Sequence, residues 1–463
     1  ACKVVEKSIA ELEKRLGESE AALEKAKQRL QQRLLTLREA AQTAYNVMNQ
    51  MRKSGDLKRF AVIQGYVSKD SLNNFKAKVG HRLSFIEEVG HESDAPTLFK
   101  NKAFMKAFQN ITLAQGPPRF GEVDPTPIIA FIFPIFYGMM FADFGQGLVL
   151  FILGLLLYLR GDPSRRPWGT VFAAAGLSAT VFGLIVGEAF GFHLSKVSGP
   201  LGEFFSQLQI LEVAELSQET VLTILTAGIL IGVIHITVGL VIDVVNGFRE
   251  EDRVELWTLK IPSLIMYVAG LFFSLAFISS GFNFGTVLRR VNSAPLPLIS
   301  AIAPIPSWLM ARITFPLVAG AIFVIIFGKA VAHALGKYKE ESLFMTIILG
   351  LVEFLIRLVE FLANSVSYAR LGILLLVHAS LMVLAKIAVE SGPMGIAAAF
   401  AWNIAVMLIE GLIVYIQALR LHIYEWFTKF YGGTGELFQK LIPETRYVEI
   451  RWRPSKLRPS AST

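Results

Sequence analysis

The chain contains a single cysteine, Cys2, which excludes an intramolecular disulfide and argues against a cysteine metal cluster. Charged residues make up 18% of the 463 residues and hydrophobic residues 53%, a balance that does not fit a soluble protein. No Gly-rich phosphate loop ending in Lys-Ser or Lys-Thr is present, so we expect no ATP hydrolysis by this chain. The net charge of +8 is not gathered in a compact basic domain, which argues against nucleic-acid binding.

The charge that is present is segregated. Residues 1–57 hold much of it, whereas the region after Pro125 consists largely of apolar runs separated by short charged loops. This pattern predicts a soluble arm joined to a polytopic membrane domain. Because the chain opens on Ala1 and no signal peptide precedes the first helix, we expect it to begin partway into a longer protein.

The arm has a helical pattern over residues 4–51. Apolar residues recur three, four or seven apart, which favours a coiled coil or a long two-helix seam. At ~1.5 Å per residue the helix would reach ~70 Å, and it needs a partner helix to cover its apolar stripe. The stripe comprises Val5, Ile9, Leu12, Leu16, Leu23, Leu30, Leu34, Leu37, Ala44 and Met48. We therefore predict a coiled-coil arm over residues 1–57.

Residues 58–94 predict part of a small α/β domain. Residues 60–67 have the composition of a strand, residues 68–79 that of a capped helix, and residues 83–89 are a candidate second strand. This segment is too short to close a core by itself. A proline- and glycine-rich connector, residues 95–126, then leads into the membrane.

The membrane domain, residues 127–428, contains eight apolar stretches that predict transmembrane helices. The first two are short and are candidates for a broken or re-entrant pair. The last two exceed the ~20 residues that a span needs, so these helices must tilt, kink or protrude. The stretches are residues 127–140, 144–159, 169–190, 221–245, 261–280, 313–327, 344–388 and 398–426.

Arginine and lysine are unevenly distributed between the loops. The loops after the second, fourth and sixth stretches and the tail, residues 429–463, are rich in them, and Arg289, Arg290 and Arg312 are the exceptions. Since basic loops stay in the cytoplasm, we predict eight crossings with both termini cytoplasmic. The short loops favour a prokaryotic plasma membrane. The basic loop residues are Arg160, Arg165, Arg166, Arg249, Arg253, Lys260, Lys329, Lys337 and Lys339.

Two arginines lie in or at the end of apolar runs. Arg370 lies in the middle of residues 361–385, and Arg420 ends residues 404–419. A guanidinium keeps its proton, and a charge at membrane depth costs ~2.5–3.5 kcal/mol on insertion scales. Each arginine therefore needs a partner or a water-filled path, and we interpret both as functional.

Polar residues lie on both sides of Arg370 along the last two stretches, which would pack side by side. The outer half would be lined by His378, Asn403 and Glu410, and the inner half by Glu360, Asn364, His422 and Glu425. Gln417 shares a stripe with Glu410. Two polar half-paths offset about a positive charge fit a rotary ion motor. An ion enters one path, neutralises a carboxylate on a moving partner, and leaves by the other path.

Structural roles compete with this interpretation. Arg370 could be paired with a carboxylate of its own bundle and turned away from a partner, which would contradict the motor hypothesis. Arg420 could extend to the membrane interface, and His378 could be a packing residue. Glu410 lies among apolar residues and needs water or a partner. Structural or interfacial roles better explain Asp143, Glu188, His235 and Asp243.

Three stretches resemble the membrane-embedded stator subunit of rotary V-type and A-type ATPases, known as subunit a or subunit I. Residues 122–148 look like the family's entry to the membrane, residues 367–378 like its arginine helix, and residues 410–432 like its last helix. The resemblance extends over essentially the whole chain from about residue 60. It implies an all-α polytopic membrane domain whose last two helices are tilted and face a ring of proteolipid c-subunits.

The resemblance also implies roles for individual residues. Arg370 is the implied essential arginine and Arg420 the second. The implied extracytoplasmic half-channel contains His378 and Glu410, and the cytoplasmic one contains Ser367 and His422. Gln417 belongs to the matching last-helix motif, whereas Glu360 has no counterpart at its exact offset and is added from its position. Asn364 stands where vacuolar forms have a histidine, so the polar groups of the inner path differ here.

Partners follow from the same resemblance. The arm is similar to the family's cytosolic arm, which binds peripheral stalk subunits of the E/G type. The ring and the lipid bilayer are further partners, with the central-stalk adaptor subunit as an additional candidate. We expect no cofactor, and the translocated ion is H⁺ or Na⁺ because the ion-binding carboxylate belongs to the ring. The competing hypothesis is a secondary ion-coupled transporter with a carboxylate relay, which often shows internal repeats; we find none in the sequence.

Overall fold

The structure, a computed structural model, describes residues 2–53, 55–56, 61–80, 83, 85–87, 95–196, 199–208, 217–250, 253–287, 306–336 and 342–440. It divides into two compact units: Ala1–Gly90 with Leu437–Thr463, and His91–Glu436. Four of the predicted loop residues lie outside the described residues, as does most of the predicted tail. The four are Arg289, Arg290, Lys337 and Lys339.

The first unit begins with one long helix, α1, Cys2–Lys53. Its leucine stripe is exposed, with Leu12 66% and Leu23 70% accessible, so the predicted partner helix stays a prediction. The short strands β1 (Gly55–Asp56) and β2 (Ala61–Val62) then pair antiparallel.

The predicted strand over residues 60–67 is largely wrong, because residues 63–67 are in no strand. The predicted helix is present as α2, Lys69–Val79, with Ser68 at its N-cap. No residue of α2 is buried, so α2 contributes to no core among the described residues. Of the predicted strand over residues 83–89, the described positions 83 and 85–87 are not in a strand, and the remainder lie outside the described residues.

The second unit contains the apolar helices. Six segments are long and apolar enough to cross a membrane, and two shorter apolar helices, α5 (Thr126–Met140) and α6 (Phe144–Arg160), precede them. All eight predicted apolar stretches are thus largely helical, and we treat the chain as an integral membrane protein. The six long segments are α7 (Arg166–Val186), α9 (Gln218–Arg249), Arg253–Ser279 (α10, η3 and α11), α13 (Ser307–Ala334), Leu343–Glu390 (α14, Leu343–Ser367, and α15, Ala369–Glu390) and Pro393–Lys429, which begins with α16 (Pro393–Arg420).

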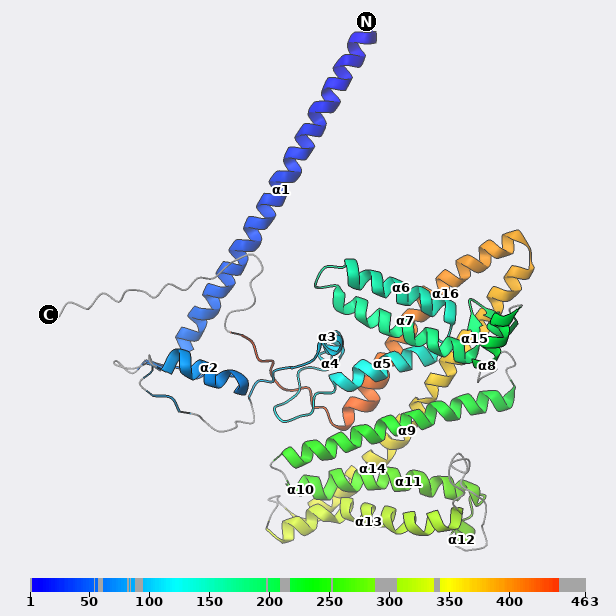
Figure 1. The fold of residues 1–463 in the computed structure, drawn as a ribbon. Coiled ribbons are helices and arrows are strands. Elements are labelled where there is room, and N and C mark those ends of the chain that lie inside the picture. The colour runs from blue at the N-terminus through cyan, green and yellow to red at the C-terminus, as the bar shows by residue number, and fades with distance from the viewer. Residues whose placement is uncertain are drawn as a thin grey trace, which may run out of the picture. The chain divides into compact units, whose positions relative to one another are not determined.

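Successive long helices run back and forth through this unit (Figure 1). The α6–α7, α9–α10 and α13–α14 connections lie at one end, and the α7–α9, α11–α13 and α15–α16 connections at the other. The basic residues Arg160 and Arg166 flank the α6–α7 connection, and Arg249 and Arg253 flank the α9–α10 connection. The basic loops therefore share one end of the bundle, and their cytoplasmic location stays a prediction.

Shorter elements join these helices and complete the second unit. They are α3 (Ala103–Lys106), α4 (Gln109–Thr112), η2 (Leu194–Lys196), α8 (Pro200–Leu208) and α12 (Phe284–Val287). The long segment Arg253–Ser279 itself consists of α10 (Arg253–Glu255), the π-helical turn η3 (Leu256–Lys260) and α11 (Ile261–Ser279).

Glycines allow α6 and α7 to pack closely. A Cβ added at Gly154 would lie 2.3 Å from the backbone nitrogen of Ala173, and one at Gly176 would lie 2.3 Å from that of Phe151. Small residues let helix backbones approach where lipid supplies no hydrophobic driving force. These contacts hold the short α6 against a helix long enough to span.

The predicted helix over residues 169–190 ends earlier than expected. Gly187 takes the left-handed conformation, with φ 81°, and ends α7 at Val186. The strands β3 (Glu188–Ala189) and β4 (Phe192–His193) then form an antiparallel hairpin.

The predicted span over residues 344–388 is two helices. α14, Leu343–Ser367, and α15, Ala369–Glu390, meet at Tyr368. The last helix, α16 (Pro393–Arg420), continues as a π-helical turn, η4 (Leu421–Trp426), and a 3₁₀ turn, η5 (Phe427–Lys429). Irregular turns of this kind in membrane helices often mark functional sites. Here they lie beside Arg370 and His422.

The start of the predicted tail packs on the connector. The hydroxyl of Tyr431 donates to the carbonyl of Gly116 at 2.6 Å, and the amide of Gly435 donates to that of Pro117 at 3.0 Å. Burial, with the nearby carboxylates of Glu122 and Asp124, raises the pKa of Tyr431, so this hydroxyl stays protonated and remains a donor.

Candidate functional site

His378 and Glu410, predicted to line the outer half, are in direct contact. The Nδ1 atom of His378 on α15 lies 3.0 Å from the Oε2 atom of Glu410 on α16. The side chain of His378 is fully buried and that of Glu410 is 5% exposed. A carboxyl group among apolar side chains needs such a partner. The fold therefore brings together two residues that are 32 positions apart in the sequence.

Asp143 joins this pair from a third element. Its Oδ2 atom lies 3.9 Å from the Nε2 atom of His378, so the imidazole stands between two carboxylates. Asp143 caps α6 by accepting from the amide of Gln146 at 2.7 Å, and it also accepts from the amide of Phe190 at 2.8 Å. From the sequence alone, Asp143 is expected to have a structural or interfacial role. The Asp-x-x-Gln spacing at the start of an apolar helix is a capping signal that locates it.

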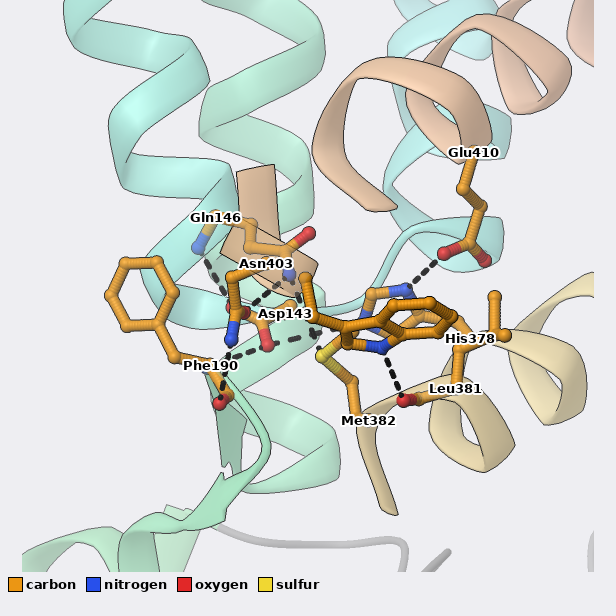
Figure 2. Close-up of polar contacts among 9 residues, drawn as sticks. Asp143, Gln146, Phe190, His378, Leu381, Met382, Asn403 and Glu410 are labelled. Carbon is orange, nitrogen blue, oxygen red and sulfur yellow. Dashed lines mark hydrogen bonds and ion pairs between the residues drawn. The ribbon is translucent and has the colours of Figure 1, made fainter. Parts of the chain in front are cut away.

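Figure 2 shows how further polar groups extend this cluster. The side-chain amide of Gln146 donates to the Oδ1 atom of Asn403 at 2.8 Å. Asn403 in turn donates to the carbonyl of Ala399 at 3.0 Å. Asn403 was expected in the outer lining, whereas Gln146 was missed. We call the set Asp143, Gln146, His378, Asn403 and Glu410 the outer cluster.

Several buried oxygens near the outer cluster have no hydrogen-bond partner within the described part of the chain. They include Oε1 of Glu410, Oε1 of Gln146 and Oε2 of Glu188. Buried polar atoms in proteins are almost always satisfied, commonly by ordered water. The outer cluster therefore places unpaired acceptor oxygens close to the buried imidazole of His378.

Arg370 lies immediately after the break between α14 and α15. Its Nη2 atom donates to the hydroxyl of Ser367 at 3.0 Å, and its Nη1 atom lies 3.6 Å from the Oε1 atom of Glu425. Ser367 donates to the same carboxylate oxygen at 2.6 Å. The competing expectation of a carboxylate partner in the same bundle is thus met by Glu425. The pairing is incomplete, because Nη1 is buried without a hydrogen bond to any described residue.

Arg370 and Arg420 both lie on exposed helix faces. The Arg370 side chain is 20% exposed, and Ile373 and Val377, three and seven residues later on α15, are 49% and 41% exposed. Residues at this spacing share one face of a helix. Arg420 is exposed at the end of α16 on the same face as Ile416, which is 51% exposed. Neither arginine is turned into the bundle core.

His422 does not share the surroundings of Ser367, the other residue predicted for the cytoplasmic half-channel. The imidazole is fully buried, its Nδ1 atom bonds the carbonyl of Ala418 at 2.8 Å, and the rings of Phe136 and His235 lie 5.2 Å away. Its Nε2 atom has no hydrogen-bond partner among the described residues.

The remaining predicted residues divide into paired and unpaired groups. Glu360 accepts from the ammonium group of Lys429 at 2.6 Å, which links α14 to η5. The Oε1 atom of Gln417 and the Nδ2 atom of Asn364 are buried without a partner in the described ranges. Asp243 forms an ion pair with Lys260 at 3.2 Å, in keeping with its expected structural role.

Comparisons with known proteins complete this description. Residues 1–171 match the family described as the V-type ATPase 116kDa subunit family. An A-type ATP synthase subunit I from Saccharolobus solfataricus is 24% identical over 90% of this chain and 64% of its own length. Its counterpart from Aeropyrum pernix is 29% identical, over 80% and 54%. A V-type ATP synthase subunit I 2 from Treponema pallidum is 39% identical over 111 residues, 24% of its length. The chain thus covers less than two thirds of these relatives.

Proposed function

Because residues 1–171 match the V-type ATPase 116kDa subunit family and most of the chain is similar to A-type ATP synthase subunits I, we propose that it is the ion-translocating stator subunit of a rotary V/A-type ATPase. In this role it provides two offset half-channels, and it presents Arg370 to carboxylates on a moving ring of c-subunits.

The position of Arg370 carries the proposal. The Arg370 side chain lies on an exposed face of α15. The residues of the outer cluster that contact His378 are buried, and His378 comes later on the same helix than Arg370. His378 is eight residues after Arg370 on α15, which corresponds to ~12 Å along the axis. Ser367 and Glu425 lie on the other side of Arg370 and supply polar groups for the inner path. This offset is the arrangement that an ion path interrupted by a fixed cation requires.

The chemistry follows from the electrostatics of the arginine. A ring carboxylate that approaches Arg370 is stabilised in its ionised form, so its pKa falls and it releases its ion. A guanidinium has five donor hydrogens and binds a carboxylate with two of them side by side. The Arg370 side chain is 20% exposed, so a ring carboxylate that approaches the exposed face can bind the guanidinium there, whereas the buried Nη1 atom lies 3.6 Å from Glu425. The fixed charge also opposes direct passage of a cation between the two paths.

The other roles rest on the same premise. The exposed leucine stripe of α1 suits a partner helix, and we assign it to peripheral stalk subunits of the E/G type. The ion is H⁺ or Na⁺, the membrane is a prokaryotic plasma membrane, and both termini are cytoplasmic. The central-stalk adaptor is a further candidate partner.

The test is Arg370→Ala in the reconstituted whole complex, with ATP-driven ion pumping as the measurement. We expect pumping to be abolished while the complex still assembles. Arg370→Lys tests the geometry, since it keeps the charge but loses the planar fork. Arg312→Ala, which removes an exposed arginine from α13, is the matched control and should pump normally.

Two results would contradict the proposal. Normal pumping by the Arg370→Ala complex would remove the arginine from the mechanism. Ion transport by the isolated chain in vesicles, without the other subunits, would favour the secondary transporter instead.

A further inference from the structure

The break that precedes Arg370 depends on a buried tyrosine. Tyr368 joins α14 to α15, and its side chain is completely buried. It lies against α9 at a glycine: a Cβ added at Gly232 would lie 2.1 Å from the Cγ atom of Tyr368. Only a residue without a side chain leaves room there, so the helix junction is seated on α9 at this point.

His235, one helical turn further along α9, holds this tyrosine. Its Nδ1 atom lies 2.8 Å from the hydroxyl of Tyr368, and both side chains are buried. Burying a hydroxyl group without a hydrogen-bond partner is costly, so this hydrogen bond fixes the position of the Tyr368 side chain. Since Tyr368 is two residues before Arg370, the bond also fixes the first turn of α15.

The same imidazole contacts the segment that carries the partner of Arg370. The ring of His235 stacks on Trp426 with 4.6 Å between centroids and 18° between planes. Trp426 follows Glu425 directly in η4. The ring of Phe136 on α5 also contacts His235 edge-on, with 5.1 Å between the two ring centroids. One side chain of α9 thus contacts both the residue beside the break and the neighbour of Glu425.

From these contacts we infer that His235 is a positioning residue for Arg370. Through Tyr368 and Trp426 it sets the spacing between the guanidinium and the Glu425 carboxylate, and with it the presentation of Arg370 on the outer face. The inference rests on the proposed function, because it assigns His235 a role only if Arg370 carries the ion exchange. A residue that merely fills space would need the ring but not the hydrogen bond.

The experiment measures ions pumped per ATP hydrolysed by the reconstituted complex. A loss of folded complex lowers both rates together and leaves this ratio unchanged, whereas a misplaced arginine lowers the ratio. Tyr368→Phe removes only the hydroxyl, and His235→Leu removes the whole imidazole. His235→Asn keeps a polar group near the position of Nδ1. Tyr267→Phe is the matched control, because it removes a 2.9 Å hydrogen bond to Ser365 on the α14 side of the break.

We expect Tyr368→Phe and His235→Leu each to lower the ratio about tenfold, the effect of losing one buried hydrogen bond. The double variant should be no worse than His235→Leu alone, since that change already removes the contact with the Tyr368 hydroxyl. His235→Asn and Tyr267→Phe should stay within about twofold of the unmodified complex.

Arg370→Ala, measured alongside, separates the two levels of the argument. If it abolishes pumping while Tyr368→Phe leaves the ratio unchanged, the positioning role of His235 is wrong and the proposed function stands. If Arg370→Ala pumps normally, the proposed function fails. A ratio that falls equally for Tyr267→Phe and Tyr368→Phe would also overturn the positioning role, because the effect would not be specific to the break.

Discussion

The ion pair between Glu360 and Lys429 gives the sharpest quantitative prediction. The two charged atoms are 2.6 Å apart, the Lys429 side chain is completely buried, and the Glu360 side chain is 26% exposed. The ammonium group also lies 5.3 Å from the ring centroid of Phe361. Replacing Glu360 by glutamine therefore leaves a buried cation that has lost its only carboxylate within ion-pair distance among the described residues.

Removing one partner of a buried ion pair costs about 3–5 kcal/mol, whereas replacing both by apolar residues is often neutral or stabilising. We therefore expect Glu360→Gln to lower the free energy of unfolding by about 3 kcal/mol or more, over a hundredfold in the folding equilibrium. Glu360→Leu with Lys429→Met should lie within about 1 kcal/mol of the unmodified chain.

The assay is equilibrium unfolding of the purified chain in mixed detergent micelles, followed by helix content. Glu353→Gln is the control, since it breaks a 2.8 Å pair with Lys329, whose side chain is 19% exposed and can still be solvated. Its cost should be less than half that of Glu360→Gln. Additive losses in the double variant would refute the reasoning. If the stable double variant also fails to pump in the whole complex, Glu360 belongs to the inner path.

Two further predictions concern the neighbouring helices. Glu410→Leu should slow ion pumping while the complex still assembles, because it removes the carboxylate that His378 contacts at 3.0 Å. Glu390→Leu, at the exposed end of α15, is the control. Equal pumping rates for the two variants would contradict the expectation. Gly232→Ala should destabilise the chain by about 1–3 kcal/mol, because the added methyl group overlaps Tyr368. Gly270 has open space around it, so Gly270→Ala should stabilise the chain by about 0.5–1 kcal/mol in the same unfolding assay.

The apolar helices could be predicted because their signal is composition over a long window. The predicted stretch 261–280 became α11, Ile261–Ser279, and the stretch 127–140 became α5, Thr126–Met140. The contact of His378 with Glu410 could also be anticipated, since both lie on the outer half of neighbouring helices. These inferences need only hydrophobicity, helical spacing and the cost of a buried charge.

The break at Tyr368 could not be predicted from the same information. No proline or glycine marks it, and the residues around it are apolar enough to continue one helix. The break is stabilised from outside, by the space at Gly232 and the hydrogen bond to His235 on another helix. For the same reason the sequence favours a structural or interfacial role for His235 and does not indicate Lys429 as the partner of Glu360. Long-range contacts of this kind leave no local signal in the chain.

The sites around His378 and Arg370 differ in how accessible they are from outside the chain, and this difference bears on mechanism. His378 is fully buried between Glu410 and Asp143, and Asp143 is itself held by two backbone amides. Arg370 donates a hydrogen bond to Ser367 among the described residues, and its side chain is 20% exposed. A group that lines a path must stay in place, whereas a group that meets successive partners must be accessible to them. The outer cluster has the first property and Arg370 the second, so exchange of carboxylates is expected at the arginine and not at the histidine.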